Sequence, residues 1–170
     1  MARATRVRGR KNLNRILLCV AAAVLCACGN YEHKYLSVGG AWHREQALSF
    51  EENLQALDEA RTLDLYVGLR YSAAYPYKSL WVQVETLAGG DSVVSRDTVC
   101  CDIYGDNGRR GGSTAGTLYQ AEFFAASVNA LWRDVHAVRL QHIMQDSLLQ
   151  GVYDVGIRLS SPCQRQCAEK

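Results

Sequence analysis

The stretch Thr62–Thr86 reads TLDLYVGLRYSAAYPYKSLWVQVET and contains two runs in which apolar and polar residues alternate. Successive side chains of a β-strand point to opposite faces, so each run predicts a strand with one apolar face and one wetter face. The apolar positions are Leu63, Leu65, Val67, Leu69 and Tyr71 in the first run and Leu80, Val82, Val84 and Thr86 in the second. One face of each strand must therefore be buried by the rest of the chain.

The two runs are separated by Ala73–Lys78, which contains Pro76. Proline removes a backbone donor and pushes the preceding Tyr75 away from helical dihedral angles, so this segment is a connection and not part of either strand. Two strands joined by a short connection indicate a hairpin and hence an antiparallel sheet.

Further strands and turns follow from the same kind of pattern. Leu48, Phe50 and Leu54 share one parity and predict a first strand, followed by a turn or a short helical piece at Gln55–Arg61. The turn signal Ala88-Gly89-Gly90-Asp91 separates the second run from a strand at Val93–Ile103. Two more segments are predicted, a glycine-rich loop at Asp106–Gly116 and a last core strand at Gly151–Ser160 with Tyr153, Val155, Ile157 and Leu159 on one face.

The region Leu118–Gln150 fits two different patterns. It lacks glycine and proline, and Phe124, Val128, Leu131, Val135 and Val138 are spaced like an apolar helical stripe. An uncapped helix of this length on a small sheet would be unusual. If the region forms strands instead, His136, Val138, Leu140, His142 and Met144 share one face.

The N-terminus has the pattern of a secretory signal peptide. Residues 1–15 carry six basic residues and no acidic one, and Ile16–Ala27 is apolar but shorter than the ~20 residues that a membrane span needs. Leu25-Cys26-Ala27-Cys28 resembles the lipobox of bacterial lipoproteins, which predicts lipidation of Cys28. Cleavage without lipidation is the alternative.

The expected organisation is a signal peptide over 1–27, a lipidated tether over 28–40, one domain over 41–161 and a tail over 162–170. The whole chain has 19 basic and 17 acidic residues, and the signal holds six of the basic ones. The mature part then has 13 basic against 17 acidic residues, a net charge of −4, which gives no support to nucleic-acid binding.

The chain resembles a known family, the gliding motility lipoproteins GldH of Bacteroidota, over roughly Trp42–Leu159. The segments that carry the resemblance are Leu69-Arg70, Tyr75-Pro76-Tyr77, Leu80-Trp81, Asp97-Thr98 and Gln141–Leu159 (QHIMQDSLLQGVYDVGIRL). The sequence departs from the family pattern at Ser79, where asparagine is usual, at Gln145, where a basic residue is usual, and at Arg110, near an expected tryptophan. The turn at Asn129–Arg133 lacks the family's glycine.

The resemblance implies an all-β fold, so two strands are expected at Leu118–Asn129 and Asp134–Gln145 in place of a helix. The predicted fold is a single antiparallel β-sandwich, immunoglobulin-like or jelly-roll-like. The resemblance also implies a lipid-anchored protein of the outer membrane, on its periplasmic side. It would be a non-enzymatic component of the gliding and secretion machinery, with other envelope proteins as partners.

The sequence offers little catalytic chemistry. His136 and His142 lie too far apart along an extended strand to share a metal, and no serine sits in a recognisable nucleophile turn. No cofactor is expected. Asp154 and Arg158 are predicted to form a surface ion pair.

Four cysteines remain after Cys28, and an oxidising envelope permits disulfides. In a strand, Cys100 and Cys101 point to opposite faces. Cys163 and Cys167 are candidates for a disulfide that pins the tail. Alternatively one of them bonds Cys100 or Cys101, or the thiols are free and buried.

Aromatic residues gather around the connection between the two runs. Core packing explains most of them, but exposed side chains at Tyr75, Pro76, Tyr77 and Trp81 would form a partner-binding patch. A rival function is an envelope module that binds a small molecule or glycan, which a pocket lined by Trp42, Trp81 and Trp132 would favour. The predicted interior comprises Leu65, Val67, Leu69, Val82, Val84, Val155 and Ile157.

Overall fold

The computed structural model describes residues 33–51, 63–105, 107–128 and 135–160. This part of the chain is made of β-strands, and none of its residues belongs to a helix that could cross a membrane. The strands are β1 (His33–Ser37), β2 (Ala41–His43), β3 (Leu48–Glu51), β4 (Leu63–Ser72), β5 (Ser79–Ala88), β6 (Ser92–Asp102), β7 (Ser113–Ala115), β8 (Leu118–Val128), β9 (Val135–His142), β10 (Leu148–Gln150) and β11 (Val152–Ser160).

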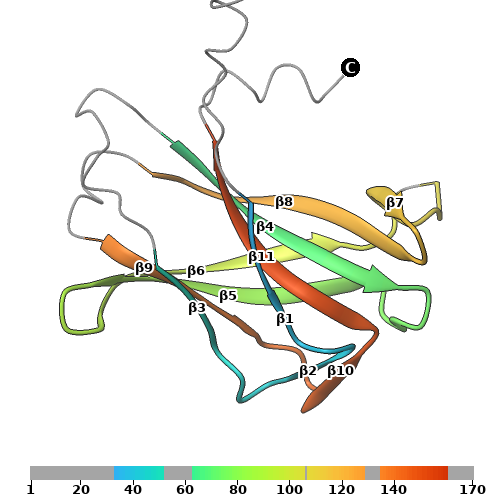
Figure 1. Cartoon of the computed structure of the whole chain (residues 1–170), viewed down its shortest axis with the longest axis horizontal. Helices are drawn as coiled ribbons and strands as arrows, with labels where there is room; N and C mark the ends of the chain where they lie inside the picture. The colour runs from blue at the N-terminus through green and yellow to red at the C-terminus, as the bar shows by residue number, and fades with distance from the viewer. Residues whose placement is uncertain (1–32, 52–62, 106, 129–134, 161–170) are drawn as a thin grey trace, which may run out of the picture. The chain divides into compact units, whose positions relative to one another are not determined.

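The strands form two main antiparallel sheets that pack against each other as a sandwich (Figure 1). One sheet has the order β1-β11-β4-β8-β7 and the other has the order β3-β9-β5-β6. Strands β2 and β10 pair separately beside them. The predicted class, an all-β antiparallel sandwich, is confirmed.

The predicted hairpin between the two alternating runs is wrong. Strand β4 pairs with β11 and β8, whereas β5 pairs with β6 and β9 in the other sheet. The connection Ala73–Lys78 therefore crosses from one sheet to the other. Alternation specifies which face of a strand is apolar. Two strands show the same alternation whether they pair side by side in one sheet or face each other across a core. The hairpin that does form joins β5 to β6 through the predicted Ala88–Asp91 turn, where Gly90 and Asp91 have positive φ angles.

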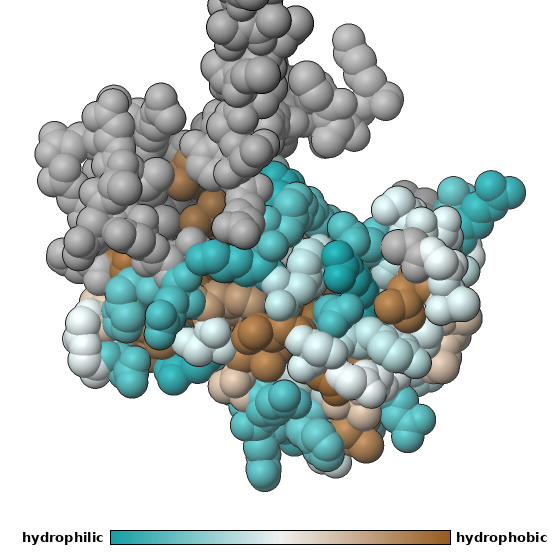
Figure 2. Space-filling model, in the orientation of Figure 1, coloured by the Kyte–Doolittle hydropathy of each residue, from teal (hydrophilic) through white to brown (hydrophobic). Residues whose placement is uncertain are grey.

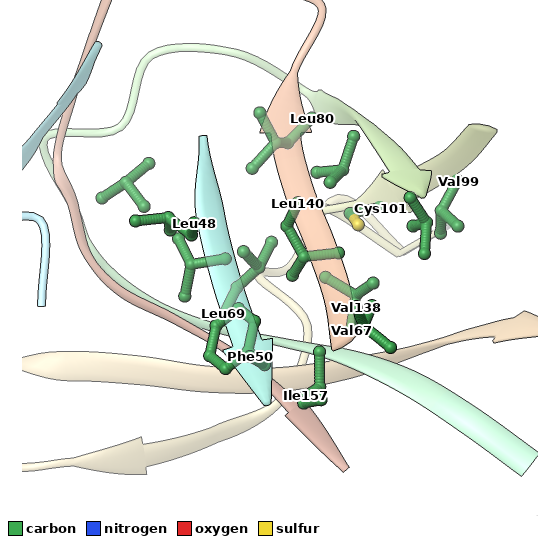
Figure 3. Packing of buried hydrophobic residues seen from close by; sticks show 14 of the residues in the cluster. Leu48, Phe50, Val67, Leu69, Leu80, Val99, Cys101, Val138, Leu140 and Ile157 are labelled. Atoms are coloured by element: carbon green, nitrogen blue, oxygen red, sulfur yellow. The ribbon is translucent and has the colours of Figure 1, made fainter. Parts of the chain in front are cut away.

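The core lies between the inner faces of the two sheets (Figure 3). All seven residues predicted to form the interior are buried, and they come from both sheets. The other buried apolar residues of the described chain include Trp42, Leu48, Phe50, Leu63, Tyr71, Tyr75, Leu80, Val99, Cys101, Ile103, Val138, Leu140 and Leu149.

The region with two possible patterns forms the strands β8 and β9, so the helical interpretation is wrong and the one implied by the family resemblance is confirmed. The expected common face is only partly correct. Val138, Leu140 and His142 are buried, but His136 is exposed. The ladder between β9 and β5 shifts register next to Leu87 and Ala88, so alternation is interrupted before Val138.

A bulge in β11 explains why the predicted inward position of Tyr153 is wrong. The ladder between β11 and β4 shifts between Val152 and Asp154, so Val152 is buried and Tyr153 is exposed.

The expected Asp154–Arg158 pair is also wrong. Arg158 pairs instead with Glu122 of β8, with N and O atoms 2.8 Å apart.

Two segments that were predicted to be irregular contain strands. His33–Ser37, expected in the tether, forms the edge strand β1 and pairs with β11 along its whole length. Ser113–Ala115, expected in the glycine-rich loop, forms β7 and pairs with the start of β8. Neither segment alternates long enough to give a period-2 signal. Strand β1 depends on the distant β11, whereas β7 pairs with the strand that follows it in the sequence.

Strand β1 is held by an aromatic ring packed on two glycines. Gly68 of β4 and Gly156 of β11 are register partners, and Tyr35 is the register partner of Gly156 on the next strand. A Cβ at position 68 would lie 2.5 Å from the Tyr35 hydroxyl, and one at position 156 would lie 2.6 Å from Tyr35 Cδ1 and overlap the Lys34 carbonyl oxygen. The Arg70 guanidinium lies over the ring, with its central carbon 4.3 Å from the ring centroid. Only glycine leaves room for the ring at these two places.

Several predicted features lie outside the described residues. These are the signal peptide, Cys28, Leu54, Gln55–Arg61, Trp132, Cys163 and Cys167.

We expect Gly156→Ala to destabilise the sandwich, because the added Cβ would force β1 away from β11. Overpacking of this kind costs about 1–3 kcal/mol of the free energy of unfolding. Denaturant unfolding measures the loss, and hydrogen exchange of residues 33–37 locates it. The control is Gly89→Ala, since no atom lies within 4 Å of a Cβ built at Gly89 and its φ is not positive. Equal stability of the two variants would contradict the packing of Tyr35 on the glycine pair.

Candidate interaction surface

The predicted partner-binding residues divide between the interior and the surface. Tyr75 is buried and belongs to the core, with its ring in edge-to-face contact with Tyr71 and its hydroxyl donating to the Ser79 carbonyl at 3.0 Å. Burial raises the pKa of this hydroxyl. Tyr75 is therefore not available to a partner, and its assignment to an exposed patch is wrong. Tyr75 lies in the connection, outside both alternating runs, so the sequence pattern could not show which way its side chain points.

Trp81 and Pro76 are exposed and Tyr77 is half-buried. Trp81 points away from the core on the outer face of β5, with 45% of its surface accessible. Ile143, which follows β9, is equally exposed, and its backbone N–H donates to the Trp81 carbonyl at 3.0 Å. Two large apolar side chains from distant parts of the sequence thus lie on neighbouring chain segments.

A groove of about 330 Å³ adjoins these two side chains. We call this groove and its lining the Trp81 surface, which consists of Tyr77, Trp81, Ile143, Met144, Gln145 and Asp146. The Tyr77 hydroxyl donates to the Asp146 carboxylate, and the backbone N–H of Trp81 donates to Met144 Sδ at 3.4 Å. The sequence pattern indicated Tyr77 and Trp81 but not the other four residues, because nothing in the pattern of Ile143–Asp146 shows that this segment lies beside Trp81.

The loop that contributes Ile143–Asp146 is fixed from its other side by Arg44. The Arg44 guanidinium donates to the carbonyl oxygens of Met144, at 2.6 Å, and Gln145, while Gln141 Nε2 donates to the Arg44 carbonyl at 2.6 Å. These groups also line a second, wider groove of about 500 Å³. The Trp81 surface is consequently preformed and does not depend on a partner to order it.

Beneath the second groove, His142 is fully buried against Trp42, with ring centroids 5.1 Å apart in an edge-to-face arrangement. Burial lowers the pKa of His142, which favours the neutral imidazole. His142 belongs to the packing beneath the groove.

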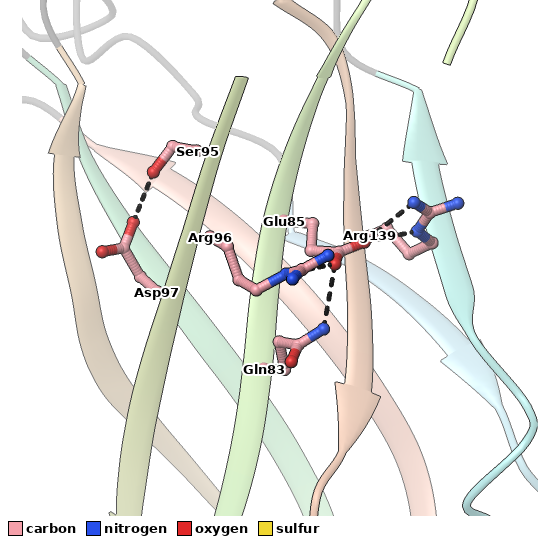
Figure 4. A network of polar contacts seen from close by, with 6 residues as sticks. All are labelled: Gln83, Glu85, Ser95, Arg96, Asp97 and Arg139. Carbon is pink, nitrogen blue, oxygen red and sulfur yellow. Dashed lines mark hydrogen bonds and ion pairs between the residues drawn. The ribbon is translucent and has the colours of Figure 1, made fainter. Parts of the chain in front are cut away.

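The outer face of the β3-β9-β5-β6 sheet carries a charged network centred on Glu85 (Figure 4). This buried carboxylate accepts hydrogen bonds from Arg96 at 2.8 Å, Arg139 at 2.9 Å and Gln83 at 2.9 Å. Burial alone would raise the pKa of Glu85, but the hydrogen bonds and charges of Arg139 and Arg96 outweigh it and hold the pKa below its ordinary value. The network ties β5 to β6 and β9, and the two arginines compensate the negative charge of Glu85.

The other candidate chemistry is not assembled in the described residues. Cys100 and Cys101 point to opposite faces, as predicted, and both are free thiols. Burial raises the pKa of Cys101, which disfavours the reactive thiolate. No group of three His, Cys, Asp or Glu side chains within the described ranges lies close enough to hold a metal ion.

The rival prediction required a pocket shared by three tryptophans. Trp42 is enclosed in the core, where its indole N–H donates to the Gln46 carbonyl at 3.0 Å, whereas Trp81 is on the surface. These two residues do not line a common pocket. The face of the molecule shown in Figure 2 is mixed, with separate hydrophobic patches among hydrophilic residues.

The described residues form a small β-sandwich with a groove beside the exposed side chains of Trp81 and Ile143. The chain belongs to the GldH lipoprotein family, whose sequence model matches residues 30–159. It is 26% identical over 157 residues to the gliding motility lipoprotein GldH of Flavobacterium johnsoniae, and the match covers 86% of this chain and 95% of that protein.

Similarity to solved structures is weak. The crystal structure of the infectious bursal disease virus VP2 subviral particle matches 84% of this chain with a TM-score of 0.40 and 9% identity. The structure of the Gx strain of that virus matches 79% with a TM-score of 0.35 and 12% identity. The chain spans only 35% of each viral chain, and a likeness of this size supports no functional conclusion.

Tyr75→Ala and Tyr77→Ala are expected to have different consequences. Removing the buried Tyr75 ring leaves a cavity and should cost about 3–5 kcal/mol of unfolding free energy. Tyr77→Ala removes a half-buried ring and one hydrogen bond, so its cost should be about 1–2 kcal/mol. Denaturant unfolding of the two variants measures both values. Comparable losses would show that the two tyrosines are not divided between core and surface.

Proposed function

We propose that this protein is anchored in the outer membrane through lipid on Cys28 and acts on the periplasmic side as a non-enzymatic component of the gliding and secretion machinery. Membership of a lipoprotein family and the sequence Leu25-Cys26-Ala27-Cys28 support the anchor. The similarity to the Flavobacterium gliding motility lipoprotein supports the machinery. In this proposal the protein works by binding another envelope protein.

The Trp81 surface is the observation that carries the proposal. Tryptophan and tyrosine at the centre of a preformed groove are typical of sites that dominate protein–protein binding energy. Trp81 is fixed by its position in β5, Ile143 by its backbone hydrogen bond to the Trp81 carbonyl, and Met144 by the hydrogen bond from Arg44. A partner would insert an apolar side chain between Trp81 and Ile143 and place polar groups near Gln145 and Asp146.

The polar groups around the grooves support recognition more than catalysis. Arg44 is engaged by two backbone carbonyls, Asp146 accepts from Tyr77, and Gln141 donates to a backbone carbonyl. Each of these side chains holds a loop in place. A general acid or base needs a group that is free to exchange a proton with a bound substrate.

The anchor is tested by Cys28→Ser. Because the thioether forms on this sulfur, the variant should no longer partition into detergent and should accumulate as an uncleaved or water-soluble protein. Cys19→Ser is the control, since Leu18 directly precedes Cys19 and makes it a poor lipidation site. Phase separation with detergent, followed by mass spectrometry of the N-terminus, measures both. Unchanged partitioning of Cys28→Ser would exclude lipidation at this position.

The recognition role is tested with a photoreactive residue in place of Gln145, which lines the groove. Irradiated cells should yield a defined cross-linked product with one envelope protein. Adding Trp81→Ala should reduce the yield at least about tenfold, in keeping with the ~2 kcal/mol or more of a tryptophan at a binding centre. Phe124→Ala is the matched control, because Phe124 is also 45% exposed but lies in the other sheet. Equal yields from the two variants would exclude the Trp81 surface.

A further inference from the structure

We propose that the sandwich is held directly against the bilayer in one orientation, with the end where β1 begins facing the lipid and the Trp81 surface facing away from it. This inference rests on the proposed lipidation of Cys28. It goes beyond that proposal because it assigns a membrane-facing end to the folded domain and a height to its binding surface.

The chain between the anchor and the fold is short. Only four residues, Gly29 to Glu32, separate Cys28 from the first residue of β1. At ~3.3–3.6 Å per extended residue, the five steps from Cys28 to His33 reach at most about 18 Å. This reach is less than the length of a ten-residue strand, so the domain has no room to turn its other end towards the membrane.

Strand β1 is firmly attached to the sandwich. Terminal segments usually fray unless they are tied into a sheet. Here Lys34 Nζ donates to the Glu51 carbonyl at 2.8 Å, His33 Nδ1 lies 2.9 Å from Glu122 Oε1, and Tyr35 packs on the glycine pair under Arg70. The short connection therefore leads into a fixed point of the fold and not into a longer mobile tether.

The pairing of the strands then decides which residues share the end where β1 begins. The Lys34–Glu51 contact puts the end of β3 beside the start of β1. His33 is in register with Arg158 near the end of β11, and Arg158 with Tyr66 near the start of β4. The β5–β6 turn lies at the same end, because Ala88 pairs with Val135, the first residue of β9. We call this the anchor end.

The opposite end is formed by the Ala73–Lys78 connection, the loop after β6 and the segment Ile143–Ser147 (Figure 1). These segments are joined by hydrogen bonds, with Ile103 N–H donating to the Lys78 carbonyl at 3.0 Å. Strands β4 and β5 each have ten residues, so the two ends are separated by about 30 Å at ~3.3 Å per residue. The Trp81 surface lies towards this far end and would meet a partner well above the lipid headgroups.

Energy transfer to the bilayer tests the orientation. A fluorescent residue is placed at Ser92, beside the β5–β6 turn, or at Ser147, at the far end; both positions are exposed. The full-length lipidated protein is reconstituted in phosphatidylethanolamine–phosphatidylglycerol vesicles that carry an acceptor dye on their headgroups. The transfer rate from Ser92 should exceed that from Ser147 by about twofold or more, because the two positions lie near opposite ends of ten-residue strands. Equal transfer, or more from Ser147, would overturn the proposal.

A linker insertion tests whether the short connection between Cys28 and β1 sets the orientation. Twenty glycine and serine residues inserted after Gly29 behave as a flexible coil with a mean reach of ~25 Å, so the difference between the two labels should disappear. A difference that persists would show that the short connection does not set the orientation. Detergent partitioning is measured on each sample, so failed lipidation is recognised separately from a lipidated protein that is randomly oriented. Cross-linking through Gln145 reports on partner binding independently of both.

Discussion

The structure depends on the burial of two apolar strand faces against each other, one on β4 and one on β5. Consecutive strands in a sandwich can satisfy this only if the chain leaves one sheet and enters the other. The connection Ala73–Lys78 makes that crossing, and Tyr75 fills the corner, with its hydroxyl bonded to the Ser79 carbonyl. The crossing frees both edges of each strand for pairing. Strand β4 then pairs with β11 and β8, and β5 with β9 and β6.

The outer faces of the sheets are stabilised in different ways. On one sheet, the absence of two side chains at Gly68 and Gly156 makes room for Tyr35 and thereby attaches β1. On the other, Glu85 is buried because Arg96 and Arg139, on the two neighbouring strands, compensate its charge. Removing either arginine would leave a buried carboxylate less fully paired, which is destabilising. The network therefore links three neighbouring strands through one carboxylate.

The sequence predicted the features that depend on neighbours along the chain. Alternation identified the inner faces of β4, β5 and most of β11, and glycine and proline identified turns. What it did not predict depends on partners distant in sequence. Bulges in β11 and β9 expose Tyr153 and His136, and strand β1 has no pattern of its own. Asp64 and Glu85 look like solvent-facing positions, yet both are buried because other strands supply their hydrogen bonds, as Ser127 does for Asp64 at 2.9 Å.

The candidate surface shows the same division between local and distant information. Its first half, Tyr77 and Trp81, is adjacent in sequence and visible as an aromatic cluster, whereas Ile143–Asp146 arrives from the end of β9. Arg44, from a third segment, fixes that loop through backbone carbonyls, which carry no sequence signature at all. A groove assembled from three segments can form only after both sheets have paired and packed. Recognition at this groove is therefore coupled to the folded state of the whole sandwich, and a core substitution far from Trp81 would abolish binding together with stability.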